Sequence, residues 1–174
     1  MHCRDDHGIR GGRHDRIRDE IFKEAQRAGF NPKKEMPALI PGTQSRPADV
    51  FVEGWTNGRR MAFDVSVVSP TQDAIIDRAA ANAASAIEMR KDEKMRKHAI
   101  NCRDAGIFFE PLVVETFGGW DAAAVKTLKT IASHCAPRKS IAPDLETKQF
   151  FQRLSIALQR GNATLLLCRD RDSI

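Results

Sequence analysis

The sequence predicts an α/β domain built on a mixed sheet. The chain has 174 residues, of which 41% are hydrophobic and 29% charged, and segments of helical periodicity alternate with segments of strand type. A chain of this size and composition is large enough for one globular domain with its own core. The predicted order of elements is α-β-β-β-α-β, followed by further helices.

The first predicted helix covers residues 14–28, where apolar residues recur at helical spacing. Gly29 ends this helix and Pro32 lies just beyond it. A short strand is expected at 35–40, bounded by a Pro-Gly turn.

Two further strands are expected at 48–52 and 60–68. Between them stands Asn57-Gly58, a pair that strongly favours a hairpin. In the C-terminal half, the sequence predicts a long helix at 72–103 and a strand at 107–115. Two helices follow at 121–135 and 145–160, the second ended by Gly161, and a last strand is expected at 164–168.

Each strand of the predicted hairpin carries an aspartate among apolar residues. If the loop covers residues 54–59, Asp49 faces Asp64 across the pair. An ionised carboxylate in apolar surroundings is costly unless a cation offsets its charge. Two interpretations stay open: both residues occupy solvent-facing positions, or a hard divalent cation such as Mg²⁺ lies between them. Ser66 shares the face of Asp64.

Four short motifs carry a resemblance to a known family. They are "RHD" (13–15), "RPADV" (46–50), "FDVSVVSP" (63–70) and "EKMRKH" (93–98). Together they resemble the restriction-like endonuclease domain of site-specific non-long-terminal-repeat (non-LTR) retrotransposons, within the PD-(D/E)XK nuclease superfamily. The resemblance spans residues 3–168. It implies a restriction-endonuclease-like αβββαβ core with a mixed sheet and extra C-terminal helices.

The resemblance also implies an activity: a Mg²⁺- or Mn²⁺-dependent endodeoxyribonuclease that nicks target DNA, as in target-primed retrotransposition. Asp49 and Asp64 match the acidic pair that holds the metal. His14 belongs to the family's short motif on the first helix. Ser66 stands where the superfamily has a catalytic lysine. The retrotransposon family takes that lysine from the following helix, which points to Lys94.

The sequence departs from the family pattern in two further places. Ala48 splits the expected Pro-Asp pair, and His98 replaces a tyrosine four residues after Lys94. Glu20 and Glu24 are further acidic candidates on the first helix, although surface solvation is the alternative for both.

The assignment of the lysine raises a question of length. A straight helix from Ile76 would place Lys94 about 27 Å along the axis. That distance is too long to meet Asp64 unless the helix starts late, bends or reaches past the sheet. Lys91 and Lys97 therefore remain alternatives, and the whole basic run could instead face solvent or DNA.

The charge balance favours a polyanionic partner. The chain has 28 Lys and Arg against 23 Asp and Glu, a net charge of +5. The resemblance implies DNA, with RNA and a reverse transcriptase domain of the same polyprotein as further partners, and a nuclear location. No apolar run is long enough for a membrane span. The candidates for phosphate contacts, which would make binding salt-dependent, are Arg13, Arg59, Arg60, Lys91 and Lys97.

Residues 1–12 are interpreted as an N-terminal tail and residues 13–174 as the nuclease-like domain. The tail contains His2, Cys3 and His7, whose spacing fits no complete zinc finger. In the family a zinc knuckle lies upstream, and Cys3 would be the last of its ligands. The scattered cysteines indicate reduced thiols.

Two rival functions are compatible with the sequence. A nuclease-like fold without activity would keep the basic surface and bind nucleic acid without using a metal. An interaction scaffold or small hydrolase is the second rival. The sequence has no GxSxG, P-loop or HExxH motif, which counts against the hydrolase.

Overall fold

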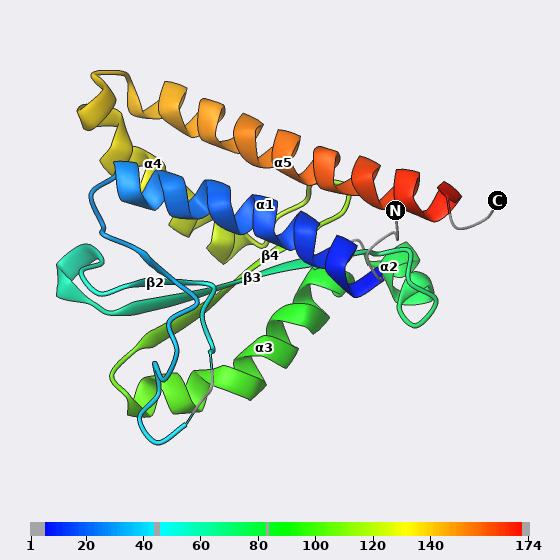
Figure 1. Cartoon of the computed structure of the whole chain (residues 1–174), viewed down its shortest axis with the longest axis horizontal. Helices are drawn as coiled ribbons and strands as arrows, with labels where there is room; N and C mark the ends of the chain where they lie inside the picture. Colours follow the sequence, from blue (N-terminus) through cyan, green and yellow to red (C-terminus); the bar gives the residue numbers. More distant parts are fainter. Residues whose placement is uncertain (1–5, 44–45, 83, 172–174) are drawn as a thin grey trace.

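The computed structural model describes residues 6–43, 46–82 and 84–171. Figure 1 labels most of its elements along the chain. They are α1 (Asp6–Arg27), β1 (Lys33–Lys34), β2 (Val50–Val52), the 3-10 turn η1 (Thr56–Gly58), β3 (Met61–Val68), α2 (Ile76–Ala81), α3 (Ser85–Asp104), β4 (Phe108–Glu115), α4 (Ala122–Lys139) and α5 (Pro143–Arg171). The α/β class and the mixed sheet are confirmed.

The sheet has the strand order β1-β2-β3-β4. β1 and β2 are antiparallel, as are β2 and β3, whereas β3 and β4 are parallel. The predicted hairpin is present between β2 and β3, with Val50 opposite Phe63. Its turn contains Asn57 with a φ of 61°, a left-handed conformation that asparagine tolerates better than most residues.

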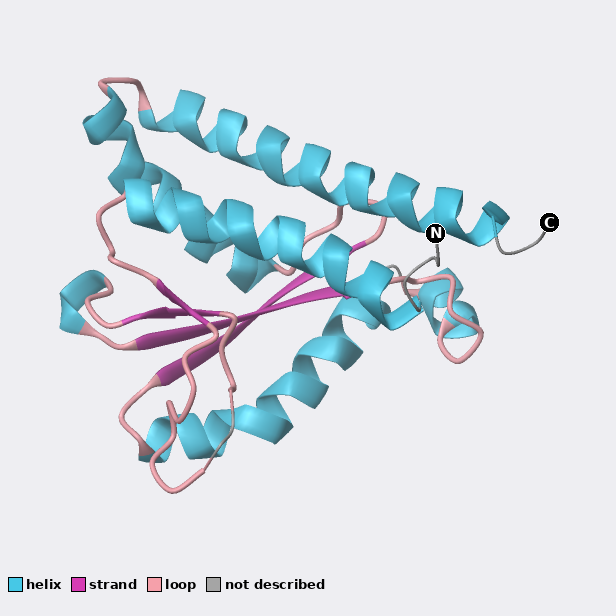
Figure 2. Ribbon diagram, viewed as in Figure 1, coloured by secondary structure: helices cyan, strands magenta, loops and turns pink. Residues whose placement is uncertain are grey.

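Helices cover both faces of the sheet (Figures 1 and 2). On one face α1, α4 and α5 form a layer whose apolar side chains make the main core. Its fully buried members include Ile17 and Ile21 from α1, Phe63 from β3, Leu128 from α4 and Leu154 from α5. Burying these large apolar side chains is the main source of stability for this half of the domain.

The opposite face of the sheet is covered by α3. Cys102 near the end of this helix joins a smaller cluster with Phe51, Ala62 and Ile107. Alternation along β3 therefore sends Phe63 towards the main core and sends its neighbours in sequence towards α3. Asp64 is one of those neighbours, which places it on the α3 side.

The prediction of a strand at residues 35–40 is wrong. This segment is a loop, and the first strand is the short β1 before it. Glu35 and Ala38 have φ values of 43° and 53°, which are incompatible with a regular strand. Leu39 and Ile40 are buried all the same, so the apolar pattern reflects burial of a loop against Phe51 and its neighbours.

The helix expected at 72–103 is two helices. α2 ends at Ala81 and α3 begins only at Ser85. The side-chain Oδ1 of Asn82 accepts a hydrogen bond from the backbone N–H of Ala84 at 3.0 Å. Such a local side-chain bond competes with the helical backbone pattern, which explains the interruption within an alanine-rich segment.

The strand expected at 164–168 is also wrong, because α5 continues through it. Gly161 lies inside α5 rather than ending it. A Cβ atom at this position would lie 2.6 Å from Cγ and 3.0 Å from Cα of Arg13 on α1. The glycine therefore permits a close approach of two helices instead of a C-terminal cap.

The N-terminal helix begins at Asp6 rather than at residue 14. It therefore includes residues 6–12 of the segment interpreted as a tail. His2 and Cys3, and with them the proposed zinc ligands, lie outside the described residues. Cys102 and Cys135 are buried free thiols, as expected. Within the described residues, no helix has the length and apolar character of a membrane span.

Candidate functional site

Asp49 lies immediately before β2 and occupies the place where that short strand would continue. Its backbone N–H donates to the carbonyl of Phe63 at 2.9 Å. Its carboxylate Oδ2 accepts from the backbone N–H of Val65 at 2.7 Å. The paired ladder ends at Val50 opposite Phe63, so Asp49 lies just beyond it, close enough to Asp64 for the two carboxylates to interact electrostatically.

His14 reaches the same carboxylate from α1. Its Nε2 lies 3.0 Å from Oδ2 of Asp49, and its Nδ1 lies 3.2 Å from Oδ1 of Asp15. Burial alone would lower the pKa of His14, but the contacts with the two aspartates outweigh it and raise the pKa above its ordinary value. The protonated, positively charged imidazole is therefore favoured.

Lys94 contacts the second aspartate from α3. Its Nζ lies 2.9 Å from Oδ2 and 3.1 Å from Oδ1 of Asp64. The break after α2 removes the obstacle to a contact between Lys94 and Asp64. Because α3 starts at Ser85, Lys94 lies only about 14 Å along the axis of this helix. Of the three lysines considered on this helix, Lys94 is the one that pairs with Asp64.

The two aspartates interact electrostatically. Asp64 is only 7% exposed, and burial raises its pKa. The positive charge of Lys94 opposes this effect, whereas the negative charge of Asp49 adds to it. The net pKa of Asp64 is raised. Asp64 on β3 and Asp49 just before β2 are thus close neighbours with two protein cations, Lys94 and His14.

Ser66 follows Asp64 by two residues on the same strand and is buried. Its Oγ has no hydrogen-bond partner among the residues that the structure describes. A buried hydroxyl without a partner is unfavourable. Water or a bound ligand beside Asp64 would satisfy it.

The basic residues proposed to contact phosphate are divided among three places. On α1, Arg13 donates to Oδ1 of Asn162 on α5 at 3.0 Å. At the hairpin, Arg59 lies over the ring of Phe108 and Arg60 donates to a backbone carbonyl after α3. These three arginines therefore do not lie together beside Asp49 and Asp64.

The two lysines proposed for phosphate contacts differ in their surroundings on α3. Lys97 is exposed. Lys91 is half-buried, and its Nζ lies 2.9 Å from Oδ1 and 3.0 Å from Oδ2 of Asp121. Asp121 also caps α4, since its Oδ2 accepts from the backbone N–H of Ala124 at 3.0 Å. Sequence reasoning did not single out Asp121, although an aspartate before an alanine run is a helix-start signal.

A second group of charged residues, here called the buried ion cluster, joins α1, α4 and α5. It consists of Glu24, Glu146, Lys139 and Arg153, and sequence reasoning missed all of it except Glu24. Lys139 Nζ lies 3.3 Å from Glu24 Oε1 and 2.7 Å from Glu146 Oε1. Arg153 Nη2 lies 2.8 Å and 2.9 Å from the same two carboxylates.

The buried ion cluster also borders Cys135. The ligand atoms of Glu24, Cys135 and Glu146 lie within 4.8 Å of one another, close enough to hold a metal ion. Lys139 and Arg153 already neutralise both carboxylates, however, so a divalent cation would have to displace them. The geometry is that of an ion-pair network between helices.

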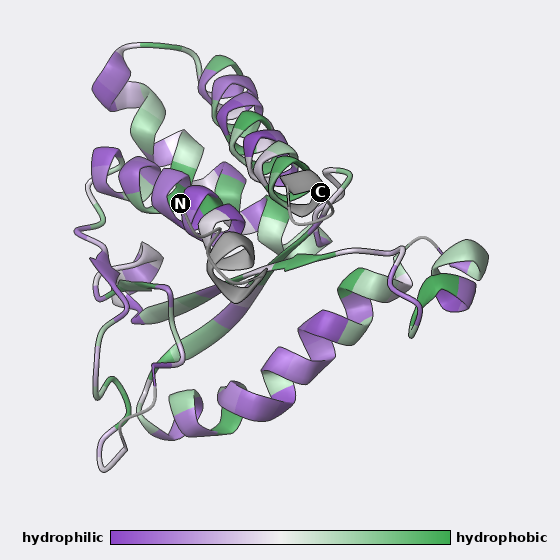
Figure 3. Cartoon of the chain, turned by 45° about the vertical axis from the view of Figure 1, so that its right-hand side comes forward, coloured by the Kyte–Doolittle hydropathy of each residue, from purple (hydrophilic) through white to green (hydrophobic). Residues whose placement is uncertain are grey.

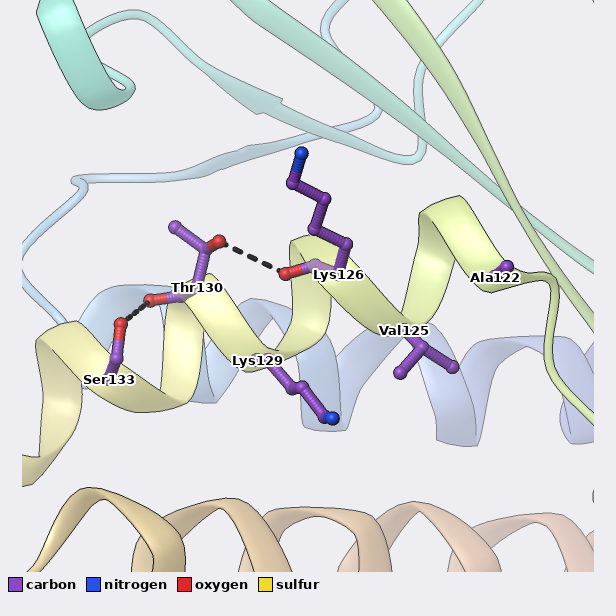
Figure 4. A pocket seen from close by; sticks show the side chains of 6 residues that line it. All are labelled: Ala122, Val125, Lys126, Lys129, Thr130 and Ser133. Carbon is purple, nitrogen blue, oxygen red and sulfur yellow. Dashed lines mark hydrogen bonds between the residues drawn. The ribbon is translucent and has the colours of Figure 1, made fainter.

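A surface hollow on α4 is a weaker candidate for a functional site (Figure 4). The labelled residues all belong to that one helix. The hydroxyl of Thr130 donates to the carbonyl of Lys126 at 3.0 Å, and that of Ser133 donates to the carbonyl of Thr130 at 2.8 Å. Both hydroxyls are thus turned to their own helix. The group of Asp49, Asp64 and Lys94 is the better candidate site.

Comparison of the sequence with models of known protein families and with curated proteins finds no match. The functional interpretation of the chain therefore depends on the geometry of this site and on the sequence motifs that form it.

Proposed function

We propose that this chain is a metal-dependent DNA endonuclease with a restriction-endonuclease-like fold, related to the nuclease domain of site-specific non-LTR retrotransposons. The observation that carries the proposal is that Asp49, just before β2, lies close to Asp64 on β3 and to its partner Lys94 on α3. Two acids that can hold a metal ion and a lysine that can stabilise developing negative charge are suited to hydrolysis of a phosphodiester. The element order α-β-β-β-α-β is also the order of this superfamily.

The residues present fit a divalent cation. Asp49 and Asp64 would hold Mg²⁺ or Mn²⁺, because these hard cations prefer carboxylate oxygens. The hydroxyl of Ser66, two residues after Asp64 on β3, has no partner among the described residues and is a further oxygen beside this site. When bound, such an ion supplies a more acidic water and a positive charge beside the scissile phosphate.

Lys94 and His14 have separate roles in the proposed reaction. Lys94 exchanges its contact with Asp64 for the phosphate and stabilises the negative charge that develops on the phosphate oxygens. His14 holds the carboxylate of Asp49 in place, together with the backbone N–H of Val65. The products are a 5′-phosphate and a 3′-hydroxyl, and in a retrotransposon that hydroxyl primes reverse transcription in the nucleus.

One observation favours a second candidate, a nuclease-like module that binds nucleic acid without cutting it. In this structure both acids already have protein cations as partners: His14 for Asp49 and Lys94 for Asp64. Such an ion network is satisfied without metal. The basic composition would serve binding in either case.

Nicking of a supercoiled plasmid separates the two candidates. The endonuclease predicts conversion to the open-circular form by the wild type with Mg²⁺ or Mn²⁺, and none with EDTA. Asp64→Asn should abolish conversion while DNA affinity, measured by fluorescence anisotropy, is retained. Lys129→Met, which removes an exposed lysine of α4 that is not among the candidate phosphate contacts, is the matched control and should still cut. Binding without conversion in the wild type under every metal condition would favour the module.

A further inference from the structure

The helix that carries Lys94 has few apolar contacts along most of its length. Of the 20 residues of α3, all of which the structure describes, the buried ones are Ala86 and Ile87 at its start and Cys102 near its end. Figure 3 shows the stretch between them coloured mainly hydrophilic. Apolar burial is therefore concentrated at the two ends of α3. Between them the ring of His98 lies against that of Phe109 on β4, with 5.4 Å between centroids, and the stretch before His98 is held by polar contacts.

Two lysines provide those contacts. Lys94 pairs with Asp64 on β3, and Lys91, three residues earlier, pairs with both carboxylate oxygens of Asp121 at the start of α4. Residues three apart lie on neighbouring positions of one helical face. The middle of α3 is thus attached at one point to the proposed catalytic strand and at another, one turn away, to the helix layer beyond β4.

Asp121 is a rigid point of attachment. Its side chain is 12% exposed, and one of its oxygens also caps α4. Burial alone would raise the pKa of Asp121, but the hydrogen bonds from Lys91 and from the backbone N–H of Ala124 lower it below its usual range. Lys91 is also attracted by Glu110 on β4. The negative charge facing Lys91 is therefore well maintained.

We propose that Lys91 is a positioning residue: its ion pair with Asp121 fixes the middle of α3 so that Lys94 points at Asp64. The inference rests on the proposed endonuclease function only for its consequence in catalysis. The structural coupling itself holds whether or not the chain cuts DNA. It assigns Lys91 a role inside the domain instead of the phosphate contact expected from the sequence.

The chain offers well-matched variants for the test. Lys91→Met keeps the length of the side chain and removes its charge, and Lys91→Arg keeps the charge and can still bond both oxygens of Asp121. Asp121→Asn removes the negative charge but leaves a residue that caps helices about as well as aspartate. Lys97→Met removes a charge from the exposed side of the same helix.

The first readout does not depend on activity. A double-mutant cycle of Lys94→Met and Asp64→Asn, measured from unfolding free energies without metal, gives the coupling between the two residues. We expect this coupling to be largely lost in the Asp121→Asn background and to be retained in the Lys97→Met background. Hydrogen exchange of the amides in the middle of α3 should accelerate in Lys91→Met and not in Lys91→Arg. Unchanged coupling and unchanged exchange would overturn the proposal.

The second readout is the nicking reaction. Lys91→Met should lower kcat by about 10- to 100-fold, the usual cost of losing a residue that orients a catalytic group, with KM unchanged and with recovery in Lys91→Arg. A raised KM with unchanged kcat would show that Lys91 contacts DNA, and would also overturn the proposal. If the wild type cuts no DNA at all, the endonuclease proposal fails while the coupling measurement still decides the role of Lys91.

Discussion

Lys94 Nζ lies 2.9 Å from Oδ2 of Asp64, which joins the middle of α3 to the middle of β3 by an ion pair. Both side chains are mostly buried, at 16% and 10% exposure. At this depth each charge depends on the other, because removing one leaves the partner without compensation in a poorly solvated place. The pair is therefore informative about both stability and function.

The first prediction concerns that pair. Lys94→Met should lower the free energy of unfolding by about 1–3 kcal/mol, since the Asp64 carboxylate loses its charged partner. Lys97→Met, on the exposed side of α3, should change it by less than about 0.5 kcal/mol. Urea denaturation without metal measures both. Equal effects of the two variants would show that the ion pair contributes nothing to the fold.

The second prediction concerns pH and His14. Its pKa is raised above the ordinary value of 6.5 in the folded protein. The stabilisation from its contact with Asp49 is thus fully present below about pH 6.5 and is lost as the pH rises through the raised value. Compared with His14→Gln, the wild type should lose unfolding free energy as the pH rises above about 6.5 and through the raised pKa of His14. Parallel pH profiles of the two proteins in metal-free urea titrations would contradict it.

The third prediction concerns Glu146 in the buried ion cluster. Burial alone would raise the pKa of this carboxyl, but its neighbours in the cluster lower it to about 2. Its stabilisation is present above the ordinary value of 4.5 and is lost as the pH falls towards about 2. Glu146→Gln should therefore be less stable than the wild type at neutral pH, and the difference should shrink on acidification. A difference that is constant from neutral pH to acid would refute this role.

The fourth prediction compares two glycines inside helices. Gly161→Ala should destabilise the fold by about 1–3 kcal/mol, because the added methyl group would meet Arg13 of α1 at 2.6 Å. Gly12→Ala, where no atom lies within 4 Å of the added group, should stabilise it by up to about 1 kcal/mol through helix propensity. Thermal unfolding of both variants tests the contrast. A gain in stability for both would show that α1 and α5 are not closely packed at Gly161.

Local patterns predicted most of the fold. The hairpin and most of the helices follow from Asn57-Gly58, from apolar alternation and from helical periodicity, whereas the parallel pairing of β3 with β4 was predicted only as far as a mixed sheet. The errors occurred where a residue type serves two purposes. Gly161 permits a close helix crossing and was interpreted as a helix end. The loop containing Leu39 buries apolar side chains and was interpreted as a strand.

The candidate site was partly predictable for the same reason. The proximity of Asp49 and Asp64 follows from the hairpin between β2 and β3, which the Asn57-Gly58 pair favours. The reach of Lys94 depends on the break at Asn82, whose side chain bonds the backbone of Ala84. The partner of Lys91 lies 30 positions away in sequence, and no local pattern connects it to Asp121.

The central claim is that Asp49 and Asp64 together bind a divalent cation. Thermal unfolding of the wild type during titration with Mn²⁺, beside Asp49→Asn and beside Lys97→Met as control, tests it most directly. We predict a concentration-dependent rise of Tm in the wild type and in Lys97→Met, and none in Asp49→Asn. An equal rise in all three proteins would contradict the metal site, and with it the proposed endonuclease.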